Sequence, residues 1–178
     1  MFPLTKPFKT ATTLKITQGF SQEHQAVDFA SFRGDWLVAP FNCKIATIRG
    51  IQELNDVTDT SFLSGGCGVR MQSIEMPEFS CTYWHCREVF PVKVGDTVLA
   101  GQPVAQMGNT GFVLSNGNYV PIELRNNPPY LGTHAHITFV TAEKNLDFSQ
   151  YIDYTIPVNF DAKQSLQAII NRIISWTK

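Results

Sequence analysis

The chain alternates between short runs of β-forming residues and closely spaced turn signals. Glycine, proline and Asn-Gly pairs recur from Gly19 to Asn116-Gly117. The runs between them are rich in β-branched, aromatic and cysteine residues, as at 36–38, 43–48, 81–84, 103–107 and 135–140. Short strands at this spacing, without long helical patterns between them, indicate antiparallel pairing. We therefore expect a mainly β (α+β) fold built on an antiparallel sheet.

A different period appears at the C-terminal end. Asp161 is a residue type that caps helices, and the apolar positions after it follow helical spacing. These positions are Leu166, Ile169, Ile170, Ile173 and Ile174. They predict a C-terminal helix that packs on the sheet. Residues 145–160 read as a connection, so we divide the chain into a domain over 1–144 and a linker with helix over 145–178.

The segment 112–133 is long for a connection inside a compact domain. It carries Asn116-Gly117-Asn118, Asn126-Asn127-Pro128-Pro129 and Gly132. Loops of this length are often functional, for instance as the rim of a cleft. A tolerated surface insertion explains the segment equally well.

Composition and charge narrow the class of protein. The chain has 178 residues, of which 43% are hydrophobic and 16% charged, as expected for one globular domain with a real core. Its 14 basic and 15 acidic residues give a net charge of -1, which argues against nucleic acid or an anionic membrane surface as a partner. No apolar run is long enough to span a bilayer. The first residues show no secretory signal, so we leave the localisation open.

Cys43, Cys67, Cys81 and Cys86 form no CxxC pair, which argues against a structural zinc knuckle. Two disulfides remain open, but buried thiols are the favoured interpretation, because a chain of this size does not need covalent crosslinks.

The four histidines carry the candidate chemistry. His24 and Asp28 are four residues apart, His134 and His136 have strand period two, and His85 ends another predicted strand. Zinc accepts imidazole nitrogen and carboxylate oxygen in tetrahedral sites, and a catalytic site keeps one position for water. Two histidines and one carboxylate make such a set and leave two histidines for proton transfer.

The order of these motifs resembles the lysostaphin-type zinc endopeptidases, which cut peptidoglycan peptides. The resemblance runs from about Ile16 to Val140. It rests on the following segments in this order: 16–20 before HxxxD at 24–28, then 34–40, 65–69, Tyr83-Trp84-His85, 94–104, Gly108-Asn109-Thr110-Gly111 and His134-Ala135-His136. Each motif is weak alone, and seven in the family's order are a specific signal.

The resemblance implies a role for each of these residues. It makes His24, Asp28 and His136 the ligands of a Zn²⁺ ion, and His85 and His134 the catalytic histidines. It also implies a peptide of bacterial peptidoglycan as the substrate. Since no wall-binding module or signal peptide is seen, a virion-associated lysin from a phage, or delivery by a secretion assembly, fits as well as a bacterial autolysin.

Two features of the sequence depart from the family's pattern, and two other functions compete with it. Ala26 replaces the glycine usual inside HxGxD, and the long loop puts substrate preference in doubt. A non-catalytic binding or regulatory module on the same fold is the alternative function. A biotinyl or lipoyl carrier, suggested by 94–107, is set aside, because Gln106-Met107-Gly108-Asn109 offers no lysine to modify.

Overall fold

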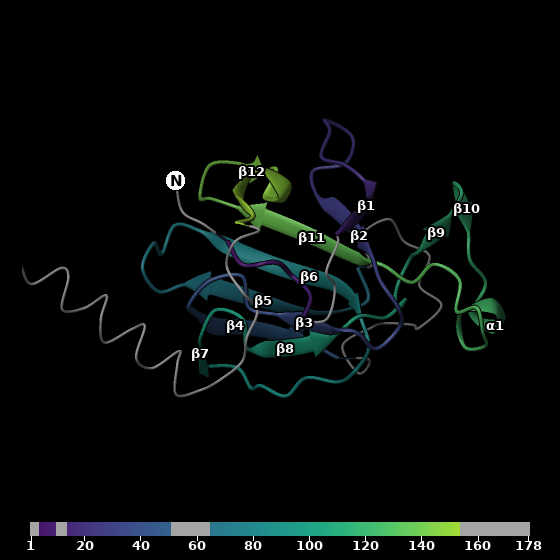
Figure 1. The fold of residues 1–178 in the computed structure, drawn as a ribbon, viewed down its shortest axis with the longest axis horizontal. Helices are drawn as coiled ribbons and strands as arrows, with labels where there is room; N and C mark the ends of the chain where they lie inside the picture. Colours follow the sequence, from purple (N-terminus) through teal and green to yellow (C-terminus); the bar gives the residue numbers. More distant parts are fainter. Residues whose placement is uncertain (1–3, 10–13, 51–64, 154–178) are drawn as a thin grey trace, which may run out of the picture.

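A computed structural model describes residues 4–9, 14–50 and 65–153 of the chain. Its main element is one antiparallel sheet of eight strands in the order β1-β2-β11-β6-β5-β4-β7, with β12 paired to β11 (Figure 1). The strands of this sheet are β1 (Lys15–Gln18), β2 (Val27–Ala30), β4 (Cys43–Arg49), β5 (Cys67–Ser73), β6 (Ser80–Cys86), β7 (Thr97–Val98), β11 (Ala135–Val140) and β12 (Asn145–Leu146).

Two small pairs of strands accompany the sheet. β3 (Trp36–Val38) pairs with β8 (Pro103–Gln106), and β9 (Leu114–Ser115) pairs with β10 (Asn118–Tyr119). One short helix, α1 (Ile122–Arg125), and a 3₁₀ turn, η2 (Phe148–Tyr151), complete the described part. The prediction of a mainly β antiparallel fold is confirmed at this level. The short α1 was not predicted, because four residues carry no periodicity.

The C-terminal helix predicted after Asp161 lies outside the described residues. The boundary after residue 144 stays a prediction as well. The chain continues past it as β12, whose Asn145 and Leu146 pair with Val140 and Phe139 of β11. Phe148 in η2 is fully buried. No helix among the residues that the structure describes is long and apolar enough to cross a membrane.

The alternation of the central strands divides their side chains between two faces. Phe29, Tyr83 and Phe139 are fully buried and belong to one apolar cluster on the core face. The neighbouring positions Asp28 and His136 lie on the opposite face, directly across from one another in the register of β2 and β11. The strands thus bring one carboxylate and one imidazole together without help from a loop.

The cysteines belong to this core. All four are buried thiols with no disulfide between them, as favoured from the sequence. Burial raises the pKa of Cys43 to about 12, with a smaller contribution from Glu75. Thiols of this kind stay protonated and unreactive near neutral pH.

Candidate metal centre

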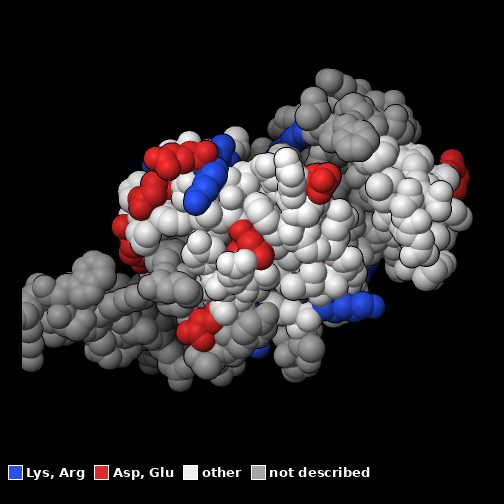
Figure 2. Space-filling view, turned by 90° about the horizontal axis from the view of Figure 1, so that it is seen from above, with Lys and Arg blue, Asp and Glu red and all other residues white. Residues whose placement is uncertain are grey.

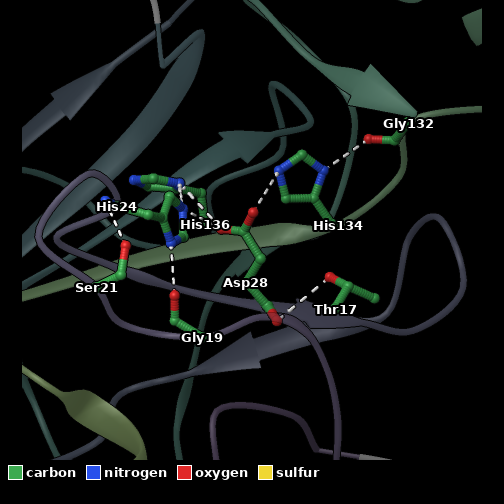
Figure 3. A network of polar contacts seen from close by, with 8 residues as sticks. All are labelled: Thr17, Gly19, Ser21, His24, Asp28, Gly132, His134 and His136. Atoms are coloured by element: carbon green, nitrogen blue, oxygen red, sulfur yellow. Dashed lines mark hydrogen bonds and ion pairs between the residues drawn. The ribbon is translucent and has the colours of Figure 1, made fainter. Parts of the chain in front are cut away.

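Asp28 is the centre of a cluster of three histidines (Figure 3). Its Oδ1 lies 3.0 Å from Nδ1 of His136 and 3.3 Å from Nε2 of His24, and its Oδ2 lies 3.7 Å from Nε2 of His134. The two nitrogens of His24 and His136 are 3.3 Å apart. One atom each from His24, Asp28 and His136 therefore lie within 4.8 Å of one another, as a shared metal ion requires.

The carboxylate is poorly satisfied by the protein itself. Asp28 is 7% exposed, and its Oδ1 is buried without a hydrogen bond. Burial raises the pKa of this carboxyl, but His136, His134 and His24 lower it by more, so that the net pKa lies below its usual value. A buried carboxylate oxygen without a donor and two imidazole nitrogens facing it form a donor set that suits Zn²⁺. The residues present fit the metal that the sequence implies.

Backbone carbonyls fix the orientation of three histidines. Nδ1 of His24 lies 3.1 Å from the oxygen of Gly19, and Nδ1 of His134 lies 2.8 Å from that of Gly132. Nδ1 of His85 lies 2.8 Å from the oxygen of Thr110. A carbonyl accepts only, so each Nδ1 carries the hydrogen and each Nε2 keeps its lone pair. In His24 that lone pair faces the candidate metal position.

His85 reaches the cluster through an irregularity in β6. Three steps along β6, from Tyr83 to Cys86, oppose only two steps along β5, from Cys67 to Val69. The extra residue is a β-bulge, and His85 has a left-handed φ of 58° there. Regular alternation would put His85 on the core face with Tyr83. The bulge places it instead beside the other rings, with centroids 4.6 Å from His134 and 5.7 Å from His136.

Both additional histidines are held in the neutral form. Burial, together with the charges of His134 and His136, keeps the pKa of His85 well below its usual value. Burial also lowers the pKa of His134, although the nearby Asp28 carboxylate partly offsets the shift. Neutral imidazoles with a lone pair on Nε2 are able to accept a proton at neutral pH.

The backbone of the segment 108–110 packs directly against His85 and His134. Gly108 forms an isolated antiparallel β-bridge with His134, and its N-terminal neighbour Met107 forms one with Cys86. A Cβ on Gly108 would lie 2.9 Å from the carbonyl oxygen of His85, so only glycine fits this approach. Sequence reasoning recognised 108–111 as a motif but not that the Thr110 carbonyl holds His85. A backbone acceptor leaves no mark in the residue type.

The five residues singled out from the sequence are thus gathered at one place, although they come from different parts of the chain. The structure brings His24, Asp28, His85, His134 and His136 together. The model of peptidase family M23 matches residues 22–134, which hold four of the five. The chain belongs to peptidase family M23. The resemblance to lysostaphin-type peptidases is thereby confirmed, and His24, Asp28 and His136 form a His, Asp, His set of candidate metal ligands.

Solved structures agree with the fold of this M23 peptidase. A zinc-containing peptidase from Vibrio cholerae matches with a TM-score of 0.55 and 19% identity, over 82% of this chain and 37% of its own. The catalytic domain of the antimicrobial peptidase lysostaphin from Staphylococcus simulans matches with a TM-score of 0.54 and 21% identity, over 78% of this chain and 91% of its own.

A third structure, Csd3 of Helicobacter pylori, matches with a TM-score of 0.58 and 18% identity, over 99% of this chain and 42% of its own. The chain therefore spans well under half the length of two of these proteins. A search of curated proteins finds no match. The interpretation as a phage or virion-associated lysin finds no support in these comparisons.

Proposed function

We propose that this M23 peptidase hydrolyses peptide bonds in the crosslinks or stem peptides of bacterial peptidoglycan. The observation that carries the proposal is the convergence of two imidazole nitrogens on the buried, unsatisfied Oδ1 of Asp28. We assign His24, Asp28 and His136 as the ligands of Zn²⁺. When bound there, the ion supplies Lewis acidity and lowers the pKa of a bound water.

His134 is the better placed of the two remaining histidines to act as general base. Its Nε2 carries the lone pair, because Nδ1 donates to the carbonyl of Gly132. This Nε2 lies 3.7 Å from Oδ2 of Asp28. If it accepts a proton from the attacking water, the carboxylate would stabilise the charge of the imidazolium. The same proton can then pass to the leaving amine.

His85 is assigned the second role, interaction with the oxyanion of the tetrahedral intermediate. Its Nδ1 is fixed on the Thr110 carbonyl, so its Nε2 is the ring nitrogen left to interact with a substrate. This role requires a proton on Nε2, and burial disfavours that proton in the resting protein. His85 therefore becomes effective only when the reaction brings negative charge beside it.

The test is digestion of purified muropeptides with several crosslink types, with the products identified by mass spectrometry. The zinc-loaded protein should release defined peptide fragments, and His134→Ala at equal zinc content should not. Full zinc occupancy without cleavage of any muropeptide would instead favour the alternative, a non-catalytic binding module on this fold.

A further inference from the structure

A pocket of about 380 Å³ lies beside the segment 109–111, in which the Thr110 carbonyl contacts Nδ1 of His85. Arg33, Arg87 and Arg125 line it, with Glu88 as the acidic residue among the lining side chains. On the face drawn in Figure 2, by contrast, charged side chains are scattered among uncharged ones. Three guanidinium groups against one carboxylate give the lining of this pocket an excess of positive charge, although the net charge of the chain is -1.

Arg125 is the most deeply placed of the three. It is 4% exposed, and its guanidinium donates from Nε to the carbonyl of Val120 at 2.7 Å and from Nη1 to the carbonyls of Asn109 and Gly111. The ring of Tyr119 lies 5.1 Å from its Cζ. These contacts tie α1 to the carbonyls of Val120, Asn109 and Gly111. They leave Nη2 of Arg125 buried without a partner among the described residues.

Arg33, in the segment that follows β2, also packs on a tyrosine ring and also has a buried donor without a partner among the described residues. Its Cζ lies 5.0 Å from the centre of the Tyr130 ring, and its Nε is buried without a hydrogen-bond partner in the described part of the chain. Buried donors of a charged group cost free energy unless an acceptor reaches them. An anion with two oxygens is the acceptor that guanidinium groups bind best.

The position of the pocket relates it to the candidate active site. Thr110 is part of its lining, and the carbonyl of the same residue accepts from Nδ1 of His85. A ligand bound in the pocket would therefore be separated from His85 by Thr110 alone. Ile122, Arg125 and Asn126 of the long segment 112–133 line one side of the pocket. The rings of Tyr119 and Tyr130, from the same segment, contact Arg125 and Arg33.

We infer that this pocket binds a free carboxylate of the peptide substrate and thereby selects acidic peptides. The inference rests on the proposed function, since it takes the substrate to be a peptidoglycan peptide. Such peptides carry free carboxylates that can be converted to carboxamides without other change. A carboxamide keeps the shape and loses the charge, so it separates recognition of a carboxylate from recognition of the peptide as a whole.

The experiment compares a crosslinked muropeptide with counterparts in which one free carboxylate at a time is a carboxamide. We expect one amidation to lower kcat/KM of the zinc-loaded enzyme by about 10-fold or more, as for loss of a charge-assisted hydrogen bond. Arg33→Gln and Arg87→Gln should reduce that discrimination to about 2-fold or less. Lys144→Gln removes one exposed positive charge in the turn between β11 and β12 and should keep the discrimination. Arg125 is left intact because three carbonyls depend on it.

A binding measurement separates the two hypotheses. Calorimetric titration with a stem tetrapeptide and its amidated forms requires no cleavage, and the carboxylate form should bind about 10-fold tighter to the wild-type protein. Discrimination in binding without any hydrolysis would support the pocket and overturn the proposed reaction. Hydrolysis with equal kcat/KM for carboxylate and carboxamide substrates would support the reaction and overturn the pocket. Inorganic phosphate that binds while the carboxylate peptides do not discriminate would also overturn it, in favour of a phosphate site. Tm and zinc content of each variant confirm that folding is retained.

Discussion

At the scale of single residues, the site depends on which nitrogen of each histidine carries its hydrogen. In three histidines Nδ1 donates a hydrogen bond to a backbone carbonyl. His24 donates to Gly19, His85 to Thr110 and His134 to Gly132. Each of these interactions selects a tautomer and a ring direction together. The proposed ligands His24 and His136 are the two whose ring nitrogens lie nearest to Asp28 Oδ1, at 3.3 Å and 3.0 Å.

This assignment predicts two classes of variant. Alanine at His24, Asp28 or His136 should cut zinc content sharply, because a three-ligand site rarely survives with two. His85→Ala and His134→Ala should retain zinc and lose activity by ~10² or more, as for removal of a general acid or base. Metal analysis and kcat/KM on one muropeptide measure both quantities. Normal zinc content in all three variants of the first class would disprove the ligand assignment.

The lowered pKa of His85 predicts a pH dependence of stability. In the unfolded chain His85 titrates near 6.5, whereas burial keeps it neutral to much lower pH in the folded protein. The unfolded state therefore binds more protons below pH 6.5, and the free energy of unfolding should fall as the pH drops, by up to about 1.4 kcal/mol per pH unit for this one group. Urea unfolding of zinc-free protein between pH 7 and 5 measures the slope, and His85→Gln should reduce it. Parallel curves for the two proteins would contradict the prediction.

At the scale of elements, the β6 bulge and the segment 108–110 together position His85. The bulge turns His85 out of the core, and the close approach of Gly108 brings the Thr110 carbonyl to its ring. The hydroxyl of Thr110 also donates to the carbonyl of Cys86 at 2.7 Å. The same segment thus fixes both the strand end and the histidine.

Gly108→Ala should therefore impair activity and stability together. Its Cβ would lie 2.7 Å from the nitrogen of Arg87 and 2.9 Å from two backbone atoms of Cys86 and His85, so the segment must move away. Overpacking of this kind typically costs ~1–3 kcal/mol. Gly19→Ala is the matched control, since nothing lies within 4 Å of its added Cβ and the substitution keeps the backbone carbonyl that His24 contacts. Thermal melting and kcat/KM measure the two effects, and a Gly108→Ala protein that behaves like the control would refute the argument.

At the scale of the whole molecule, the sheet brings distant parts of the sequence to one place. His24 and His136 are separated by 112 residues, yet the antiparallel pairing of β2 and β11 sets Asp28 opposite His136. Zinc binding should therefore stabilise the fold as a whole, because the proposed ligands belong to separate segments that a bound ion would hold together. A metal that binds only the folded state adds about 2.7 kcal/mol at a free concentration of 100 times its Kd.

Removal of zinc by a chelator should accordingly lower Tm, and zinc added back should restore it. His134→Ala should show the same zinc-dependent shift as the wild type, whereas Asp28→Ala should show none. Differential scanning calorimetry with and without chelator measures the shift. Equal Tm values for the zinc-free and zinc-loaded wild type would argue against a metal bridging these segments.

The sequence by itself determined the class of fold and the identity of the cluster. Short β-rich runs between turns predicted the antiparallel strands, and strand period two put His134 and His136 together. These features are local, because alternation and turn residues act within a few positions. The order of motifs then supplied the family, which the match over residues 22–134 confirmed.

Only the tertiary structure decided where His85 points and which groups Arg33 and Arg125 contact. Alternation alone puts His85 in the core, and the bulge that reverses this arises from pairing with β5. An arginine among the polar residues of 112–133 suggests a surface position, yet Arg125 at the end of α1 is only 4% exposed. It packs against carbonyls of the segments 109–111 and 120. Strand register and burial depend on contacts between residues far apart in the chain, and no local pattern encodes them.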